Sequence, residues 1–242
     1  MKKRSLVKLS VLLLLIMILL TGCMYPEERR AENQLPPMQQ VQLVQDAIDQ
    51  FREETGVLPI ATKEADTPIF EKYVIQFNQL VPKYLTYTPG AAFEQGGSYL
   101  FVLTDVEVQP TVRLLDLKMV ENIADIQMRV TRYFDKNKSL PVAGVVQPGY
   151  FQIDLRKIGV AKGKDAIESP ITGNSLPVIM SAAGVVGIDY GEDLKQILSG
   201  IQGEIPADKD IRSLIPENSL YVPVKSFPYV LIDGIPTLAS NQ

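Results

Sequence analysis

The chain has 242 residues, of which 46% are hydrophobic, and it carries 24 basic residues against 28 acidic ones. It contains a single Cys, no His and no Trp, which excludes Ser-His-Asp and Cys-His catalysis, imidazole-ligated zinc and internal disulfides. An enzyme of this composition would depend on carboxylates, Lys, Tyr, Ser or Thr, or on a hard cation held by oxygen atoms. We therefore expect a non-enzymatic protein that binds no cofactor.

The first 23 residues carry the pattern of an export signal. Met1–Arg4 is basic, Val11–Leu20 is an unbroken apolar run, and the run closes on Leu20–Cys23. A basic start, about ten apolar residues and a small-residue cleavage site are typical of a cleaved signal peptide, whereas a membrane-spanning helix needs about twenty apolar residues. A short uncleaved anchor or a buried helix is the alternative interpretation.

The Leu-Thr-Gly-Cys sequence at the end of this segment resembles a bacterial lipobox. The resemblance implies that the thiol of Cys23 takes a diacylglyceryl group and that cleavage after Gly22 leaves Cys23 as the acylated first residue, carrying fatty acid such as palmitate. Cys23 is the only Cys of the chain and stands at the one position that a lipobox requires.

Residues 23–37 are charged and flanked by prolines, and we interpret them as a flexible tether. Loss of residues 1–22 removes four basic residues and no acidic ones, which leaves 20 basic against 28 acidic residues. Such an acidic body disfavours nucleic acid as a partner, because phosphate binding needs clustered Lys and Arg, and an anionic lipid surface repels it. We expect a protein anchored by lipid to the cell membrane and facing the extracytoplasmic side.

Two helices are predicted from apolar residues that recur at spacings of three and four. The first has Val41, Val44, Ile48 and Phe51 on one face and ends near a glycine. The second has Ile123, Ile126, Val130 and Tyr133. An alignment of Val41 with Ile123 superposes the two sets and the Leu-Pro steps that follow them. We therefore expect Phe51 and Tyr133 at equivalent buried positions.

A second block repeats with a slightly smaller displacement along the chain. Residues 99–117 fall on residues 176–194, and Tyr73–Phe77 corresponds loosely to Tyr150–Asp154. Glycine turns precede a strand in each block. We therefore predict an α+β fold of two tandem repeats, each a helix packed on a small antiparallel sheet. Two unrelated αβ units are the alternative.

The predicted organisation then follows in chain order: a lipoprotein signal peptide at 1–22, the tether at 23–37, αβ repeat 1 at 38–117, αβ repeat 2 at 118–195 and a C-terminal extension at 196–242. The extension contains one or two further strands between residues 210 and 238. If the repeats are copies, Phe101 and Val178 occupy equivalent buried positions.

Two family resemblances accompany this organisation. A helix ending at Gly, a Leu-Pro step, a Tyr-Leu-rich turn and a Gly-Asn turn before a strand resemble the globular half of pseudopilins, although the long hydrophobic first helix of a pilin is missing. Over the full chain, the lipobox, acidic spacer and repeated body resemble an uncharacterised lipoprotein family of Bacillus-type Gram-positive bacteria, some of which are loosely described as transporter-associated binding proteins. Neither resemblance implies a catalytic motif.

Two groups of carboxylates are candidates for chemistry. Asp189, Glu192 and Asp193 form the densest acidic cluster and are a weak candidate for a Ca²⁺ site, but they lack EF-hand alternation, and a solvated loop after a strand is the preferred interpretation. Asp105 and Glu107 lie two apart on a predicted strand and would share a face. Paired carboxylates can hydrolyse glycosides, but a solvated strand face is again preferred.

Tyrosine suits both binding surfaces and protein cores. In a pseudo-twofold arrangement, Tyr73 and Tyr150 would lie on related walls of a groove, and they are the candidate binding surface. The predicted function is that of a membrane-anchored lipoprotein that binds an envelope protein or a wall polymer. The alternative is a solute-binding lipoprotein of an ABC importer, which the sequence favours less because such receptors normally alternate strands and helices.

Overall fold

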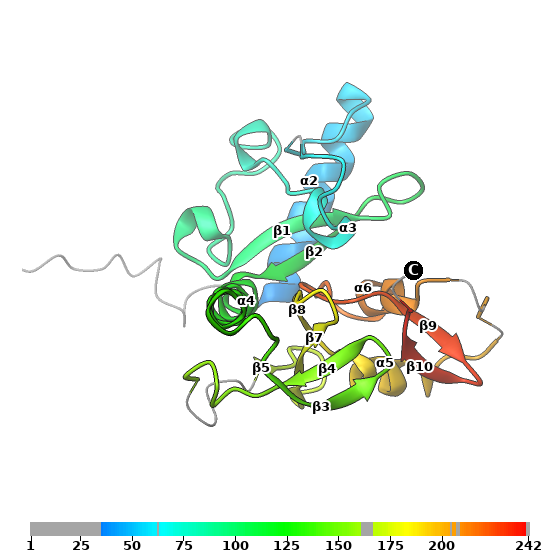
Figure 1. Cartoon of the computed structure of the whole chain (residues 1–242). Helices are drawn as coiled ribbons and strands as arrows, with labels where there is room; N and C mark the ends of the chain where they lie inside the picture. The colour runs from blue at the N-terminus through cyan, green and yellow to red at the C-terminus, as the bar shows by residue number, and fades with distance from the viewer. Residues whose placement is uncertain (1–34, 62, 161–166, 204, 207–208, 241–242) are drawn as a thin grey trace, which may run out of the picture. The chain divides into compact units, whose positions relative to one another are not determined.

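The computed structural model describes residues 35–61, 63–160, 167–203, 205–206 and 209–240 (Figure 1). The contacts within the chain group residues 37–242 into one compact unit. The predicted signal peptide, Cys23 and most of the predicted tether lie outside the described residues. Among the described residues, no helix is long and apolar enough to cross a membrane.

The fold is mixed α+β, as the sequence predicted, with small antiparallel sheets. The helices of the described residues are α2 (Pro37–Thr55), α3 (Ile69–Lys72), α4 (Leu117–Asn137), α5 (Gly191–Leu198) and α6 (Leu214–Asn218), with short 3-10 turns η3 (Phe77–Gln79), η4 (Phe93–Gln95) and η5 (Ile211–Ser213). The strands are β1 (Tyr99–Thr104), β2 (Thr111–Asp116), β3 (Val142–Gln147), β4 (Tyr150–Ile153), β5 (Ile167–Glu168), β6 (Ser175–Leu176), β7 (Val178–Ser181), β8 (Val186–Ile188), β9 (Tyr229–Ile232) and β10 (Ile235–Leu238).

Both predicted long helices are confirmed, with their apolar stripes buried. Val44 and Ile48 of α2 are completely buried, and Phe51 packs edge-on against Tyr84 with ring centroids 5.3 Å apart. In α4 the apolar positions of the predicted face are likewise buried as far as Val130. The burial of one face explains why each segment is a helix although isolated helices of this length are marginal in water.

The start and end of α4 are defined by side-chain and backbone contacts. The Asp116 carboxylate accepts hydrogen bonds from the backbone N–H groups of Lys118 at 2.8 Å and Met119 at 3.4 Å, which is an N-cap. At the other end Lys138 takes a left-handed conformation with φ of 53°, and its N–H donates to the carbonyl of Phe134.

A first layer consists of α2 on the β1–β2 hairpin. The two strands pair antiparallel from Tyr99 opposite Asp116 to Thr104 opposite Thr111. Isolated antiparallel bridges continue this layer, because Val74 pairs with Val102 and Ile60 pairs with Ile75.

A second layer consists of α4 on a four-stranded antiparallel sheet with the order β3-β4-β7-β8. In the second layer β3, the first strand after α4, pairs with β4, and β4 pairs with β7, the first strand of the β7–β8 hairpin. The bridges of the first layer follow the same order after α2. The first layer, by contrast, has isolated bridges where the second has the full strands β3 and β4.

Each long helix is fixed to its hairpin by one glutamine amide. Gln45 donates to the carbonyl of Pro110 at 3.0 Å and accepts from the N–H of Val112 at 2.8 Å. Gln127 donates to the carbonyl of Gly184 at 3.0 Å and accepts from the N–H of Val186 at 2.7 Å. The alignment that superposes the apolar faces of the two helices also places Gln45 on Gln127, and each makes the same pair of bonds at the start of the second strand of its hairpin.

The internal duplication stays a prediction that this correspondence supports. The residues expected at equivalent positions of the two repeats are not equally buried, however. Phe51 and Phe101 are buried, whereas Tyr133 and Val178 are only half-buried. Ile179, one residue after Val178, is 1% exposed, so the better match to Phe101 lies one residue further along the chain.

The segment Leu220–Phe227, here called the C-terminal segment, lies beside both hairpins. Leu114 of β2 donates its N–H to the carbonyl of Leu220 at 2.8 Å, and Ile188 of β8 donates its N–H to the carbonyl of Lys225 at 2.8 Å. Both pairings are parallel. Val222 and Val224 are buried between them, at 4% and 0% exposure, so this segment closes the outer edge of both hairpins.

Two hydrophobic clusters make up the interior. One contains α2, the β1–β2 hairpin and the loop residues between them, and the other contains α4, the four-stranded sheet and the C-terminal segment. Val102 and Leu115 of the first hairpin belong to the second cluster. The further strands expected in the C-terminal extension are confirmed as the β9–β10 hairpin.

Replacing either fixing glutamine should weaken the fold by a similar amount. We expect Gln45→Ala and Gln127→Ala each to lower the free energy of unfolding by about 1–3 kcal/mol, because each leaves a strand N–H without its partner. Urea unfolding followed by circular dichroism measures this. Gln42→Ala, at an exposed position of α2, is the control and should cost less than about 0.5 kcal/mol. Losses no larger than that of the control would contradict the assigned role.

The C-terminal segment should also be sensitive to one added methyl group. A Cβ at Gly187 of β8 would lie 2.6 Å from Cε2 of Phe227 and 2.7 Å from the carbonyl oxygen of Lys225. We expect Gly187→Ala to lower the free energy of unfolding by about 1–3 kcal/mol or more through overpacking. Gly200→Ala is the control, because its Cβ would meet only the carbonyl of Ile197 at 3.6 Å. An unchanged unfolding midpoint for Gly187→Ala would show that the segment does not pack this closely.

Candidate functional site

The two tyrosines predicted to form a binding surface lie in different places. Tyr150 is completely buried, its hydroxyl donates to the carbonyl of Ala239 at 2.9 Å, and its ring packs against Phe227. Tyr73 is half-buried against the cluster that contains α2, and its carbonyl accepts from the N–H of Leu103. Tyr150 therefore belongs to the core, and the structure does not bring the pair together on a groove.

Each of the three carboxylates proposed as a weak metal site has partners of its own. Asp193 is completely buried and accepts from the hydroxyls of Ser169 and Thr172, both at 2.7 Å. Glu192 is exposed and pairs with Lys195 at 2.6 Å. No group of three acidic, His or Cys side chains that could hold a metal is found among the described residues.

The expected solvated loop at this place is instead the start of α5. Asp193 sits in the first turn of this helix, where a carboxylate is favoured by the helix dipole. Its two hydroxyl partners come from the turn between β5 and β6, more than twenty residues earlier in the chain. Asp193 thus joins α5 to that turn.

Asp189 has a separate structural partner. The hydroxyl of Tyr229 donates to its carboxylate, which also accepts from the N–H of Gly191 at 2.8 Å. Tyr229 is 1% exposed. Burial raises the pKa of the Tyr229 phenol, and the charge of Asp189 raises it further. This phenol therefore stays neutral and remains a hydrogen-bond donor.

The second pair of carboxylates is not on a strand. Asp105 and Glu107 lie in the turn between β1 and β2, where Asp105 has a φ of 50°. Both are exposed. They do not share a strand face.

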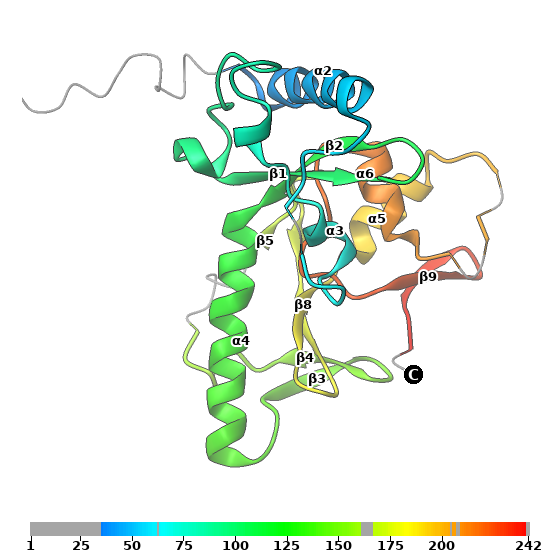
Figure 2. The same cartoon turned by 90° about the horizontal axis from the view of Figure 1, so that it is seen from above.

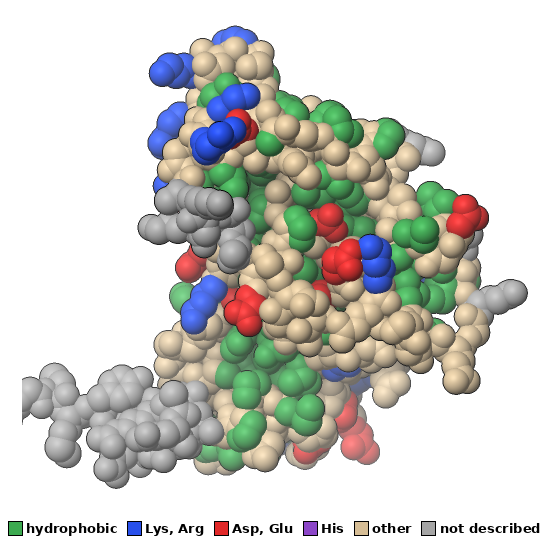
Figure 3. All heavy atoms as spheres, turned by 90° about the horizontal axis from the view of Figure 1, so that it is seen from below, with side chains coloured by type: hydrophobic (Ala, Val, Ile, Leu, Met, Phe, Trp, Pro, Cys, Tyr) green, Lys and Arg blue, Asp and Glu red, His purple; other side chains and the backbone are tan. Residues whose placement is uncertain are grey.

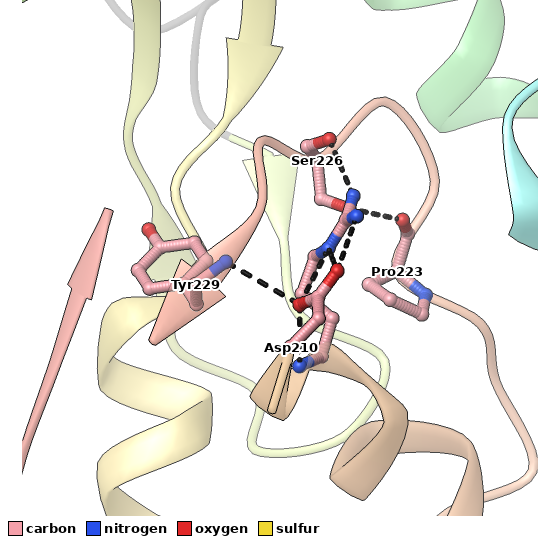
Figure 4. Close-up of polar contacts among 5 residues, drawn as sticks. Asp210, Pro223, Ser226 and Tyr229 are labelled. Atoms are coloured by element: carbon pink, nitrogen blue, oxygen red, sulfur yellow. Dashed lines mark hydrogen bonds and ion pairs between the residues drawn. The ribbon is translucent and has the colours of Figure 1, made fainter. Parts of the chain in front are cut away.

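A polar cluster around Arg212 was not predicted from the sequence (Figure 4). The Arg212 side chain is 13% exposed and binds the Asp210 carboxylate through Nη2 at 2.6 Å. Its Nη1 donates to the carbonyl and the hydroxyl of Ser226, at 2.9 and 3.1 Å. The guanidinium also lies 5.4 Å from the ring centre of Phe70. The hydrogen bonds of Arg212 therefore join it to other parts of the same fold.

A second ion pair holds the same part of the chain. Lys225 Nζ lies 2.8 Å from the Glu71 carboxylate, and both side chains are largely buried. Glu71 lies on α3, in the first layer, and the other carboxylate oxygen accepts from the N–H of Lys225 at 3.3 Å. Arg212 and Lys225 thus fix the C-terminal segment in place, and we assign them a structural role.

The main exposed feature is a group of cations that we call the basic end of α4. It lies where α4 ends and where the chain leaves β4, and Figure 3 shows Lys and Arg side chains gathered at one end of the face that it draws. Its members are Arg129, Arg132, Lys136, Lys138, Arg156 and Lys157. Arg129 is half-buried and the others are exposed.

Hydrogen bonds bring the two chain segments of the basic end together. Arg129 donates to the carbonyl of Gly159 at 3.4 Å, and Lys157 Nζ lies 3.5 Å from the carbonyl of Val142. The N–H of Asp154 donates to the carbonyl of Pro141 at 2.6 Å. The turn after β4 therefore lies against the last turns of α4.

Charge is unevenly distributed along the chain. Residues 117–160 carry seven basic and four acidic residues, whereas residues 37–116 carry five basic and eleven acidic ones. Within the basic end, Asp125 pairs with Arg129 at 2.8 Å and Asp154 pairs with Arg156 at 3.3 Å. The hydrogen bond from Arg156 lowers the pKa of Asp154, so this carboxylate is ionised at neutral pH. The basic end keeps an excess of cations although the whole chain is acidic.

The bond between Tyr229 and Asp189 can be tested directly. Tyr229→Phe should lower the free energy of unfolding by about 1.5–3 kcal/mol, because it removes a buried hydrogen bond to a charged group. Tyr87→Phe removes the same hydroxyl from a residue that is 63% exposed, and it should have almost no effect. Thermal unfolding of the two variants measures the difference, and equal midpoints would show that the bond contributes nothing to stability.

Comparison with known proteins finds a match in the first layer. Residues 37–116, from the start of α2 to the end of β2, match the YphF family N-terminal domain. No curated protein and no solved structure matches the chain. The helix and hairpin joined by Gln45 are therefore the part of the chain that a YphF family N-terminal domain covers.

Proposed function

We propose that the protein is a membrane-anchored extracytoplasmic lipoprotein whose folded body binds a partner in the cell envelope and performs no catalysis. The observation that carries the proposal is Cys23, the only Cys in 242 residues, placed at the end of a Leu-Thr-Gly-Cys sequence after a basic start and an apolar run. Acyl chains on this residue would provide the anchor, and two or more chains make such an anchor stable.

The length of chain between anchor and body fits this arrangement. Thirteen residues separate Cys23 from Pro37, the first residue of α2. Fully extended, they would span at most about 45 Å. That reach would hold the acidic body clear of anionic lipid, which would otherwise repel it.

The polar clusters of the body favour binding over catalysis. The carboxylates of Asp189 and Asp193 accept hydrogen bonds from neighbouring hydroxyls, and the partly buried cations Arg212 and Lys225 hold the C-terminal segment. The basic end of α4 is exposed, so it is the feature best suited to contact a partner.

A solute-binding lipoprotein of an ABC importer receives less support. Such receptors normally contain alternating strands and helices around parallel sheets, whereas each sheet of the described residues is antiparallel. Stabilisation by small solutes in a thermal-shift screen would favour the importer interpretation, since a captured ligand stabilises the folded state by mass action.

Replacing Cys23 tests the anchoring. Cys23→Ala should abolish incorporation of labelled fatty acid and leave the precursor unprocessed, because no other thiol is present to accept the diacylglyceryl group. Met24→Ala, at the next position, should keep both labelling and processing. Labelling of Cys23→Ala at the level of the control would overturn the proposed anchor.

A further inference from the structure

We propose that the basic end of α4 is a docking surface for a linear phosphodiester polymer of the cell envelope. This deepens the proposed function, since it gives the chemical class of the partner, and it rests on the envelope location proposed above.

The cations form one surface although they come from two segments. α4 supplies Arg129 to Lys138, and the turn after β4 supplies Arg156 and Lys157. The bond from Arg129 to Gly159 joins the turn to α4, and the contact of Lys157 with Val142 joins it to the start of β3, the strand that follows α4. The surface is therefore built by the β3–β4 topology and not by one charged helix alone.

The chemistry of these side chains fits phosphate. Arginine offers a planar set of donors that matches phosphate oxygens, and exposed lysines act as mobile point charges. The side chain of Arg156 is 92% exposed. A polymer with a phosphate in every unit can contact several such cations in succession, and release of its counterions drives binding.

A folded protein partner fits this surface less well. Stable protein interfaces have a desolvated centre of aromatic or aliphatic side chains from which charged residues are depleted. In the basic end, the large apolar side chain with the highest exposure is Phe134, at 44%, and it stands between Arg132 and Lys136 along the helix. Cations therefore dominate the surface.

An anionic membrane fits less well because the body as a whole is acidic and a flat lipid surface would face more of it than the basic end alone. The chain enters the body at Pro37, in the layer of α2, and α4 begins directly after β2 of that layer. α4 has 21 residues, so its C-terminal end lies about 30 Å from its start. Figure 2 shows this end beside β3 and β4 and away from α2. Within the folded body, the basic end therefore lies away from α2, the helix with which that body begins (Figure 2).

The experiment measures polymer binding by the full chain, purified in a non-ionic detergent. The probe is poly(glycerol phosphate), titrated at several salt concentrations. We expect binding that weakens steeply with salt. Arg132→Glu combined with Lys136→Glu should weaken binding by at least about tenfold, and Arg132→Gln with Lys136→Gln by a smaller factor. Unchanged circular dichroism of the Gln variant confirms that the fold is intact.

The matched control changes the net charge equally at distant sites. Lys63→Glu combined with Lys118→Glu alters two exposed lysines outside the basic end and should leave polymer affinity within about threefold of the wild type. Equal losses in both double variants would overturn the inference, because binding would then follow net charge alone. The wild type and the Arg132→Glu, Lys136→Glu variant share the same anchor, so a larger loss of binding to vesicles of equal parts phosphatidylglycerol and phosphatidylcholine than to the polymer would overturn the inference in favour of a membrane surface.

The inference and the proposed function can fail separately. If Cys23 is labelled with fatty acid but the wild type shows no affinity for the polymer, the docking surface is wrong and the anchored location stands. If the polymer binds at the basic end but Cys23 is not labelled, the surface stands as a polyanion site and its envelope partner is wrong.

Discussion

The parallel pairing of the C-terminal segment with β2 and β8 is the constraint on which the rest of the structure depends. The N–H groups of Leu114 and Ile188 both donate to this segment, so it supplies the outer neighbour of each hairpin. Each hairpin in turn carries one of the long helices on its face. The ion pair of Lys225 with Glu71 and the contacts of Arg212 with Ser226 hold the segment against both layers. A sheet edge that is covered in this way has fewer unpaired groups with which another chain can associate.

The glutamine contacts show how a helix can lie on a hairpin in a fixed register. A primary amide has one donor side and one acceptor side, so Gln45 and Gln127 each satisfy one carbonyl and one N–H of the neighbouring strand. Apolar contacts alone permit a helix to slide, whereas two directional bonds do not. The same pair of bonds occurs in the second layer, which has the full strands β3 and β4, and in the first layer, which has isolated bridges in their place.

Periodicity predicted the long helices and most strands because a buried stripe or an apolar run leaves a local signal. It missed α5, whose eight residues include Glu192 and Asp193 and have the composition of a solvated turn. The burial of Asp193 depends on Ser169 and Thr172, which are distant in sequence, and nothing local reveals them. Tyr150 was assigned to a surface because its residue type suits both environments. The glutamines could have been found, since the alignment that superposes the apolar positions of the two helices also places Gln45 on Gln127. The basic end could not have been predicted, because the two segments that supply its cations, α4 and the turn after β4, meet only through the β3–β4 hairpin.

The position of the C-terminal segment has a consequence for how the chain reaches its folded state. Synthesis proceeds from the amino terminus, so residues 220–227 emerge after every strand that they cover. Until then β2 and β8 each present a partly unpaired edge, and unpaired strand edges are where incomplete chains associate with one another. A chain interrupted at residue 219 would contain α2, α4 and both hairpins and would still lack the element that the two layers share. The two layers are thus completed together, by a segment that is made after both of them.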